Sequence, residues 1–155
     1  MSYQLPVSVL VVVHTAALEV LLLERAQRPG YWQSVTGSLD WPEEPLAAAA
    51  AREVLEETGI DTASGRLEDW RMANTFEIYL HWRHRFAAGV THNTEHVFSV
   101  EVPEWIDVKL APLEHIAHAW LPWQDAAERV FSPSNAEAIR ELPLHVAALR
   151  GSAGT

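Results

Sequence analysis

Cysteine is absent from the sequence, which excludes disulfide bonds and thiol chemistry. This absence is compatible with a reducing cytosol, and we expect a cytoplasmic protein. Long apolar runs are also lacking, because the run at residues 7–13 is far shorter than the ~20 residues that a membrane-spanning helix needs. No basic segment precedes that run, unlike in a signal peptide. We therefore interpret residues 7–13 as a buried strand and expect no membrane partner.

Positive charge is scarce: the chain has 11 lysines and arginines against 21 aspartates and glutamates, and its net charge is −10. An acidic protein lacks the broad basic surface that binds nucleic acid, so we expect no nucleic-acid partner. The 8 histidines do not have the spacing of a zinc site. No Walker-type glycine loop and no Ser-His-Asp signal is present. A polyanionic small molecule can still bind to such a protein when metal ions bridge the two.

The 155 residues fit one domain, which we place at residues 1–150, followed by a loose tail at residues 151–155. Hydrophobic residues make up 48% of the chain, enough to form a core. Apolar patterns and turn residues predict strands at residues 7–13, 18–23, 31–37, 70–86, 96–102 and 119–121. Helices are predicted at residues 44–58, 123–130 and 135–150, the last with Ser134 or Asn135 as N-cap and an interruption near Pro143. This order of elements indicates an α+β layered domain.

The helix predicted at residues 44–58 carries the most informative motif of the chain. Glu53, Glu56 and Glu57 stand at positions i, i+3 and i+4, so they share one face of the helix. Three neighbouring carboxylates repel one another unless a cation lies among them. Mg²⁺, or Mn²⁺ in its place, prefers oxygen ligands of this type. The motif therefore predicts metal-assisted phosphate chemistry at this face.

The opposite side of the same helix consists of small and apolar residues. We expect that side to pack against a sheet while the glutamate side holds charge; its members are Ala47, Ala48, Ala51, Val54, Leu55 and Thr58. Pro42 and Pro45 suit the entry to the helix, where a missing N–H group costs little. Gly59 suits the C-terminal cap.

Gly37, Glu44 and the segment Arg52–Ile60 resemble the Nudix box, the signature of the Nudix hydrolases. The usual box is Gly, five residues, Glu, seven residues, then Arg-Glu-apolar-x-Glu-Glu-x-Gly-apolar. Counting back from the arginine places the first glutamate at Glu44, whereas counting forward from the glycine places it at Glu43. We favour Glu44, because a helix fixes its register better than a loop does, and Trp41 is then a loop insertion. The resemblance implies a Nudix-like α/β/α sandwich with a mixed central sheet and a glutamate-rich catalytic helix.

The same resemblance implies a hydrolase in which a metal-activated water attacks phosphorus. Glu53 and Glu57 would be metal ligands, and Glu56 would be either a third ligand or a base. Arg52 would pair with a box glutamate and orient it. Glu114, far away in the sequence, matches a distal metal-binding glutamate of a narrower group within the family. It would complete the metal site or act as general base.

That narrower group is the bacterial dihydroneopterin triphosphate diphosphatases. The matching segments are Pro6–Ser8, Trp32–Ser38, Phe76–Ile78, Arg83–Arg85, Gly89–Thr91, Asn93–Glu95, Glu114–His115, Trp120–Leu121 and Ser132–Asn135. The resemblance implies removal of pyrophosphate from dihydroneopterin triphosphate in folate biosynthesis. It also implies a set of substrate contacts: Arg25 to the phosphates, Thr36 and Ser132 to the substrate, and Phe76, Glu77, Ile78 and Tyr79 to the pterin.

Other functions are compatible with the box, because it handles phosphates and metal but not the base. A Nudix enzyme acting on dATP, oxidised dGTP or a dinucleoside polyphosphate is the main alternative. Nudix folds that serve as ligand-sensing modules typically lose box glutamates, and this chain keeps all three on the helix. Trp32 is either a core residue or a stacking platform, and Arg83–Arg85 is either a solvated strand edge or a phosphate contact. The sequence does not indicate an oligomeric state.

Overall fold

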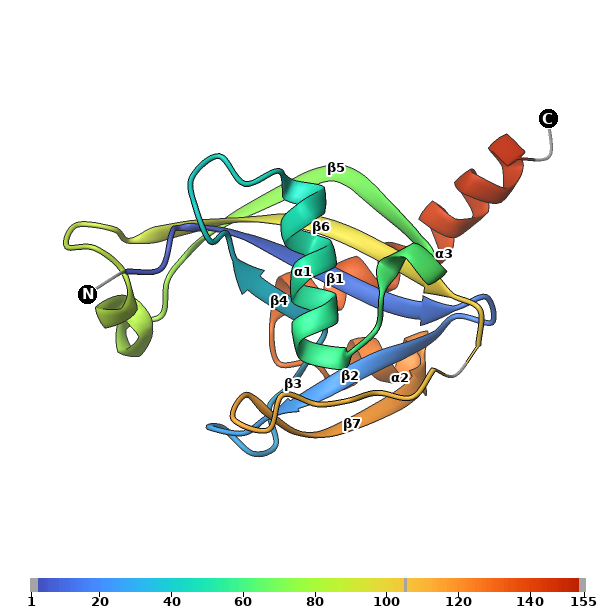
Figure 1. Cartoon of the computed structure of the whole chain (residues 1–155), viewed down its shortest axis with the longest axis horizontal. Helices are drawn as coiled ribbons and strands as arrows, with labels where there is room; N and C mark the ends of the chain where they lie inside the picture. Colours follow the sequence, from blue (N-terminus) through green and yellow to red (C-terminus); the bar gives the residue numbers. More distant parts are fainter. Residues whose placement is uncertain (1–2, 105, 154–155) are drawn as a thin grey trace.

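The computed structural model of the chain describes residues 3–104 and 106–153 (Figure 1). The strands are β1 (Val7–Thr15), β2 (Glu19–Arg25), β3 (Trp32–Gln33), β4 (Val35–Ser38), β5 (Arg66–Glu77), β6 (His92–Val102) and β7 (His115–Pro122). The α-helices are α1 (Leu46–Thr58), α2 (Trp123–Arg129) and α3 (Pro133–Ala153), and the short 3-10 helices are η1 (Thr62–Ser64) and η2 (Leu80–Arg85). Among the described residues, no helix is long and apolar enough to cross a membrane.

The strands form one mixed seven-stranded sheet in which β1 is central. β1 runs parallel to β6, with Val7 opposite Thr94 at the start of the pairing. On its other side β1 pairs antiparallel with β2 at His14 and with β4 along residues 8–11. β1 thus changes partner along its length. The short strand β4 is thereby placed against α1, where the site lies.

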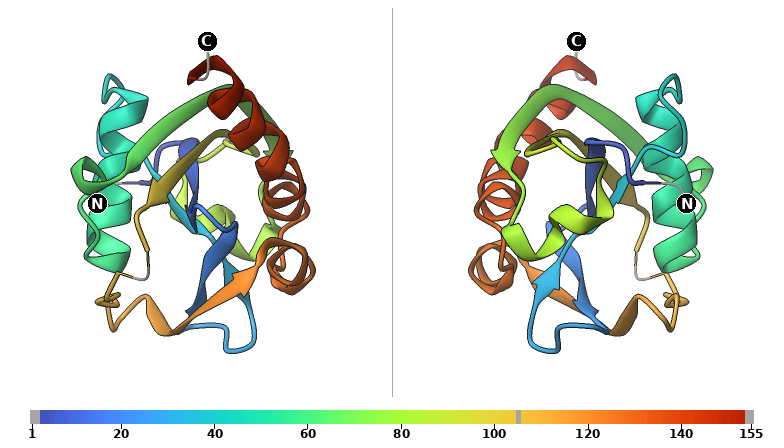
Figure 2. Two further views of the ribbon diagram at one scale, coloured as in Figure 1. Left: turned by 90° about the vertical axis from the view of Figure 1, so that its right-hand side faces the viewer. Right: turned by 90° about the vertical axis from the view of Figure 1, so that its left-hand side faces the viewer.

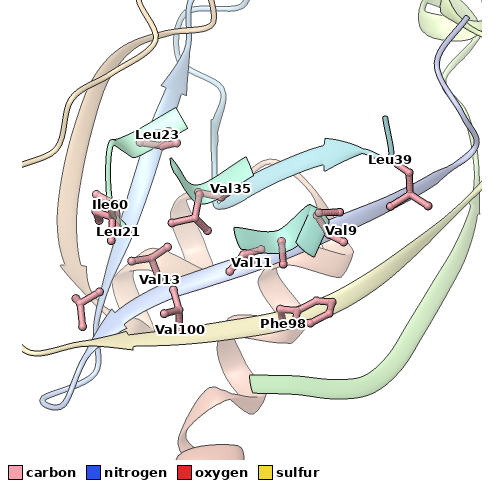
Figure 3. Close-up of a cluster of buried hydrophobic side chains, with 14 residues drawn as sticks. Val9, Val11, Val13, Leu21, Leu23, Val35, Leu39, Ile60, Phe98 and Val100 are labelled. Atoms are coloured by element: carbon pink, nitrogen blue, oxygen red, sulfur yellow. The ribbon is translucent and has the colours of Figure 1, made fainter. Parts of the chain in front are cut away.

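Helices cover both faces of the sheet: α1 lies on one face, and α2 and α3 lie on the other (Figure 2). Successive side chains of a strand point to opposite faces, so β1 contributes to both cores. Val9, Val11 and Val13 pack with residues of α1 (Figure 3). Leu10 and Val12 pack with residues of α2 and α3. The α/β/α sandwich with a mixed central sheet confirms the predicted fold class.

The strand predicted at residues 70–86 ends earlier than expected. β5 stops at Glu77, and η2 follows instead of more strand. The guanidinium of Arg83 accounts for the bend, because Nε donates to the carbonyl of Ile78 at 3.0 Å and the group pairs with Glu77. The apolar alternation beyond position 77 therefore reflects side chains of a 3-10 turn and not a strand.

α3 is continuous through Pro143, where the sequence predicted an interruption. Leu142 and Val146 flank the proline and are buried in the core, so packing outweighs the hydrogen bond that the proline removes. The helix begins at Pro133, whose fixed φ suits a first turn, and it runs to Ala153, past the predicted end. The division into one domain and a tail stays a prediction.

Ser134 and Asn135, the predicted N-caps, lie inside α3 instead. The amide of Asn135 turns to the loop between β3 and β4, where it accepts from the backbone N–H of Ser34 at 2.8 Å. Its Nδ2 donates to Oγ of Ser34 at 2.9 Å. Asn135 therefore ties the start of α3 to the strands that carry the site.

Candidate active site

α1 turns Glu53 and Glu57 toward the sheet, so the sequence-based prediction for the helix is only partly confirmed. Glu53 and Glu57 are 9% and 1% exposed, whereas Leu55 is 53% exposed. Ala47 and Ala48 are exposed as well, so the predicted packing is wrong for these residues and Leu55, whereas it is confirmed for Val54 and Thr58. Small residues on the buried side let the helix lie close to the strands, and this carries two carboxylates inward. That side consists of Ala49, Ala50, Glu53, Val54, Glu57 and Thr58.

Gly37 in β4 lies directly against the carboxylate of Glu53. A Cβ atom at position 37 would stand 2.1 Å from Cδ of Glu53. Any residue other than glycine would therefore displace the carboxylate. β4 is held at this position by its pairing with β1, in which Gly37 lies opposite Val9. The close approach of strand and helix explains why the box begins with glycine.

The carboxylate of Glu44 accepts hydrogen bonds from Arg52 and from the backbone of Asp40. Nε of Arg52 donates to Oε2 at 3.0 Å and Nη2 donates to Oε1 at 3.1 Å. The N–H of Asp40 donates to Oε1 at 2.8 Å. The hydrogen bonds from Arg52 lower the pKa of Glu44 in spite of its burial. Because Glu43 is exposed and Glu44 is buried, this network supports Glu44 as the first box glutamate.

Arg52 also reaches the helix glutamates with its remaining nitrogen. Nη1 donates to Oε1 of Glu53 at 2.7 Å and to Oε2 of Glu56 at 3.3 Å. Nη2 donates to the carbonyl of Ser38 at 3.2 Å. Arg52 thereby holds one oxygen of Glu53, in agreement with the predicted pairing between Arg52 and a box glutamate. The side chain of Glu56 is 55% exposed and stays on the outer edge of the helix.

Glu57, Glu114 and His115 form a cluster that has no internal counter-charge. Each offers one ligand atom, and these atoms lie within 4.8 Å of one another. Both oxygens of Glu57 are buried and receive no hydrogen bond from the described residues. Burial, and then the neighbouring Glu53, raise the pKa of Glu57 well above its usual range. Burial and Arg25 lower the pKa of His115 to about 4, so His115 is neutral at physiological pH.

The donors of this cluster fit a divalent cation. Carboxylate oxygens with an imidazole nitrogen beside them are ligands that such ions accept. A buried carboxylate without a partner is costly unless a positive charge meets it. Since Glu57 has no cation among the described residues within hydrogen-bond distance, a bound metal ion would supply the missing partner.

The cluster opens into a cavity of about 930 Å³. Most of the residues predicted to bind metal or substrate line it, namely Arg25, Thr36, Glu53, Glu57, Phe76, Glu77, Ile78, Tyr79, Glu114 and Ser132. Arg52 and Glu56 are not among its lining residues. Arg52 acts on the site through Glu53, and Glu56 faces outward. The catalytic roles of both residues stay predictions.

Arg25 brings positive charge to the same cavity. Its guanidinium lies 4.9 Å from the ring centroid of Trp82, and Nη1 donates to Oε1 of Gln33 at 3.1 Å. Its Nε is buried and has no partner in residues 3–104 and 106–153. Burial lowers the pKa of Arg25, and the nearby positive charges of Arg85 and Arg28 lower it further. Arginines are thus concentrated in this part of a protein that is acidic overall. An unpaired N–H beside further cations suits a phosphate.

The structure bears on two alternatives that the sequence left open. Within Arg83–Arg85, Arg83 pairs with Glu77, whereas Arg85 lines the cavity, and its contact with a phosphate stays a prediction. Trp32 is partly buried, packs against the core below α2 and α3, and is not a lining residue of the cavity. The interpretation of Trp32 as a core residue is therefore favoured over a stacking platform.

Sequence reasoning gave no role to Gln33, Asn93, Glu95 or His115, all of which line the cavity. His115 stands directly after Glu114, and Nε2 of His115 lies 3.3 Å from Nε2 of Gln33. Asn93 and Glu95 stand two residues apart in a strand. Two polar residues on the same side of a buried strand were the feature of the sequence that could have indicated a site there. Gln33 lies in the segment Trp32–Ser38, which resembles the narrower group, but that resemblance gave Gln33 no role.

Buried carboxylates, neighbouring arginines and a large cavity together define a metal-dependent enzyme that acts on phosphates. Residues 4–142 match the NUDIX domain family. The chain therefore belongs to the Nudix family, which confirms the resemblance seen in the box.

Individual relatives resemble the chain over nearly its whole length. It is 40% identical over 148 residues to dihydroneopterin triphosphate diphosphatase of Escherichia coli K12, which covers 94% of this chain and 97% of that protein. It is 38% identical over 144 residues to the Haemophilus influenzae protein of the same name, a match that covers 91% of this chain and 89% of that protein. The structure of the E. coli dihydroneopterin triphosphate pyrophosphohydrolase matches with a TM-score of 0.84 and 41% identity, covering 91% of this chain and 97% of that one.

Proposed function

We propose that the chain hydrolyses dihydroneopterin triphosphate to the monophosphate and pyrophosphate, a step of folate biosynthesis. The observation that carries this proposal is the similarity to the two diphosphatases, which extends far beyond the Nudix box. The box handles metal and phosphates, so only similarity outside it bears on the pterin. A cytoplasmic location and a single domain are expected for this enzyme and stay predictions.

Mg²⁺ is the cation that we assign to the cluster, with Mn²⁺ as a substitute. Glu53, Glu57 and Glu114 would hold it, beside His115. The unsatisfied oxygens of Glu57 and the oxygen-rich donor set support a hard cation. When bound, such a cation neutralises phosphate charge and lowers the pKa of a coordinated water.

The residues of the chain would position the triphosphate for attack. Arg25 and Arg85 would bind phosphate oxygens from one side of the cavity, and Phe76, Ile78 and Tyr79 would hold the ring. The oxygen of a water molecule bonds to phosphorus, the anhydride P–O bond breaks, and pyrophosphate leaves. A carboxylate of the site accepts the proton of the water.

The test is a Mg²⁺-dependent turnover panel of dihydroneopterin triphosphate, dATP, 8-oxo-dGTP and a dinucleoside tetraphosphate. Pyrophosphate and phosphate are quantified separately. We expect the highest kcat/KM for the pterin, with pyrophosphate as the product. Glu57→Gln serves as the inactive control, and Glu128→Gln, at an exposed position of α2, as the matched active control. A flat profile, or a preference for a nucleotide, would contradict the pterin assignment and leave Nudix hydrolysis intact.

A further inference from the structure

Asn93 and Glu95 are buried polar residues of β6 that the phosphate chemistry does not use. Both are 6% exposed, and both line the cavity. They stand two residues apart in a strand, so they share one face of the sheet. Ser8 in β1 and Asn74 in β5 lie opposite Glu95, and Phe76 lies opposite Asn93. Neighbouring strands thus form one polar wall of the cavity with an aromatic ring at its edge.

The carboxylate of Glu95 keeps capacity for further hydrogen bonds. Ser134, in the first turn of α3, donates from Oγ to Oε1 at 2.9 Å. Burial raises the pKa of Glu95, and the hydrogen bond from Ser134 offsets this only in part. A carboxylate offers about four lone-pair sites, so one donor leaves both oxygens able to accept. The described residues therefore do not complete the surroundings of Glu95.

Asn93 is also incompletely paired. Its Nδ2 donates to Oγ of Ser8 at 2.8 Å. Its Oδ1 is buried and receives no hydrogen bond from the part of the chain that the structure describes. Exchanging the oxygen and nitrogen of the amide would leave an N–H unpaired instead, so one polar group lacks a partner in either orientation. Since an unpaired buried polar group costs stability, its position at a cavity indicates a ligand group that meets it.

The hydrogen-bond acceptors of Glu95 are complementary to the donors on one edge of a particular kind of heterocycle. A 2-amino-4-oxo heterocycle carries two adjacent N–H donors, one on a ring nitrogen and one on the exocyclic amine. Two carboxylate oxygens accept such a pair side by side, as they accept the fork of a guanidinium. Adenine presents an acceptor nitrogen at the corresponding ring position, which a carboxylate repels. Hypoxanthine keeps the ring N–H but lacks the amine.

We propose that Glu95, supported by Asn93, selects substrates with a 2-amino-4-oxo heterocycle, the ring edge shared by pterins and guanine. The inference rests on the proposed function, because it takes the cavity to be the substrate site. Glu95 belongs to the wall formed by β1, β5 and β6, whereas the metal-binding carboxylates of α1 belong to another side. Substitution of Glu95 should therefore change ring preference and leave phosphate chemistry intact.

The experiment compares kcat/KM for GTP, ITP and ATP with Mg²⁺. Glu95→Gln keeps the side-chain shape and replaces one acceptor oxygen with a donor. Glu101→Gln is the matched control, since Glu101 lies on the same strand and is not a lining residue of this cavity. Wild type should prefer GTP over ITP and ATP by about tenfold or more. Glu95→Gln should lower kcat/KM for GTP about tenfold or more and change that for ATP by less than about threefold.

Equal losses on all three nucleotides, or no loss on GTP, would overturn the inference. If Glu95→Gln does not fold, Glu95→Asp, which retracts the carboxylate by one methylene, supplies the same comparison. The nucleotide set also separates this test from the pterin assignment. If dihydroneopterin triphosphate is not the preferred substrate, Glu95 can still select GTP over ITP. If the pterin is the preferred substrate, the experiment can still show that Glu95 does not select the ring.

Discussion

Glu44 and Glu57 are buried to a similar degree, 5% and 1% exposed, yet their surroundings are opposite. Glu44, just before α1, accepts two hydrogen bonds from Arg52 and one from the backbone of Asp40, and its pKa is lowered. Glu57, near the end of α1, accepts none from the described residues, and burial raises its pKa. Burial alone does not distinguish a structural carboxylate from a ligand. The distribution of donors is the observation on which we propose Glu57, and not Glu44, as a metal ligand.

Arg52 creates this difference between the two regions. It binds Glu44 through Nε and Nη2 and reaches Glu53 through Nη1, and no ion pair between it and Glu57 is present in the described chain. The nearest basic group to Glu57 is the neutral His115, with Nε2 at 3.8 Å. We therefore expect substitutions near Glu57 to affect function and those at Glu44 to affect stability.

The largest effect should follow from Glu57→Gln. Losing a metal ligand or base should lower kcat at least ~100-fold while the protein stays folded. Mg²⁺-dependent release of pyrophosphate measures turnover, and circular dichroism measures folding. Glu128→Gln should retain wild-type turnover. Near-normal turnover of Glu57→Gln would rule out the proposed site.

Gly37→Ala should also impair activity with Mg²⁺, but less than Glu57→Gln does. The added Cβ would overlap the carboxylate of Glu53, which lies at the end of a flexible side chain and can move. We expect the Mg²⁺ concentration for half-maximal activity to rise about tenfold to 100-fold, with little change in the thermal midpoint. Gly151→Ala is the control, because a Cβ at that position meets no neighbouring atom. An unchanged Mg²⁺ requirement would show that the contact does not position Glu53.

The smallest effects, on stability, should have opposite pH dependences in the metal-free protein. The folded pKa of Glu44 lies below its ordinary value of 4.5, so its stabilisation is present above pH 4.5 and is lost as pH falls through the lowered pKa. The folded pKa of Glu57 lies above 4.5, so its contribution is most favourable below pH 4.5 and is lost as pH rises through the raised pKa.

Urea unfolding at several pH values measures both contributions. At pH 7, Glu44→Gln should lower the free energy of unfolding by about 2 kcal/mol, because it weakens a largely buried ion pair, and this loss should shrink below pH 4.5. Glu57→Gln should raise the free energy of unfolding of metal-free protein at pH 7 and change it little at pH 4. The same sign for both variants at pH 7 would remove the distinction between the two regions.

The Nudix box could be recognised from the sequence because it depends on local spacing, and the α/β/α fold class followed from the family resemblance that the box carries. Seven residues between Glu44 and Arg52 sufficed to choose Glu44 over Glu43, and the structure supports that choice. The apolar stretch at residues 7–13 is sufficiently β-branched to read as a strand on its own. Such features need no knowledge of what packs against them.

The orientation of α1 could not be predicted in this way. Its period places Glu53 and Glu57 opposite Leu55, but only the position of β4 decides which side is buried. The turn after Glu77 depends on Arg83 reaching back to a carbonyl, and the wall around Glu95 depends on strand pairing. These are contacts between distant segments, which composition and periodicity do not encode.

The most direct test of the difference between the two carboxylates is the Mg²⁺-induced shift of the thermal unfolding midpoint. A ligand that binds the folded state alone raises this midpoint. We expect Mg²⁺ to raise the midpoint of wild type and of Glu44→Gln, although the midpoint of Glu44→Gln without Mg²⁺ is lower than that of wild type. The midpoint of Glu57→Gln should not change with Mg²⁺. An equal shift in wild type and Glu57→Gln would contradict the assignment of Glu57 as the carboxylate that meets the metal.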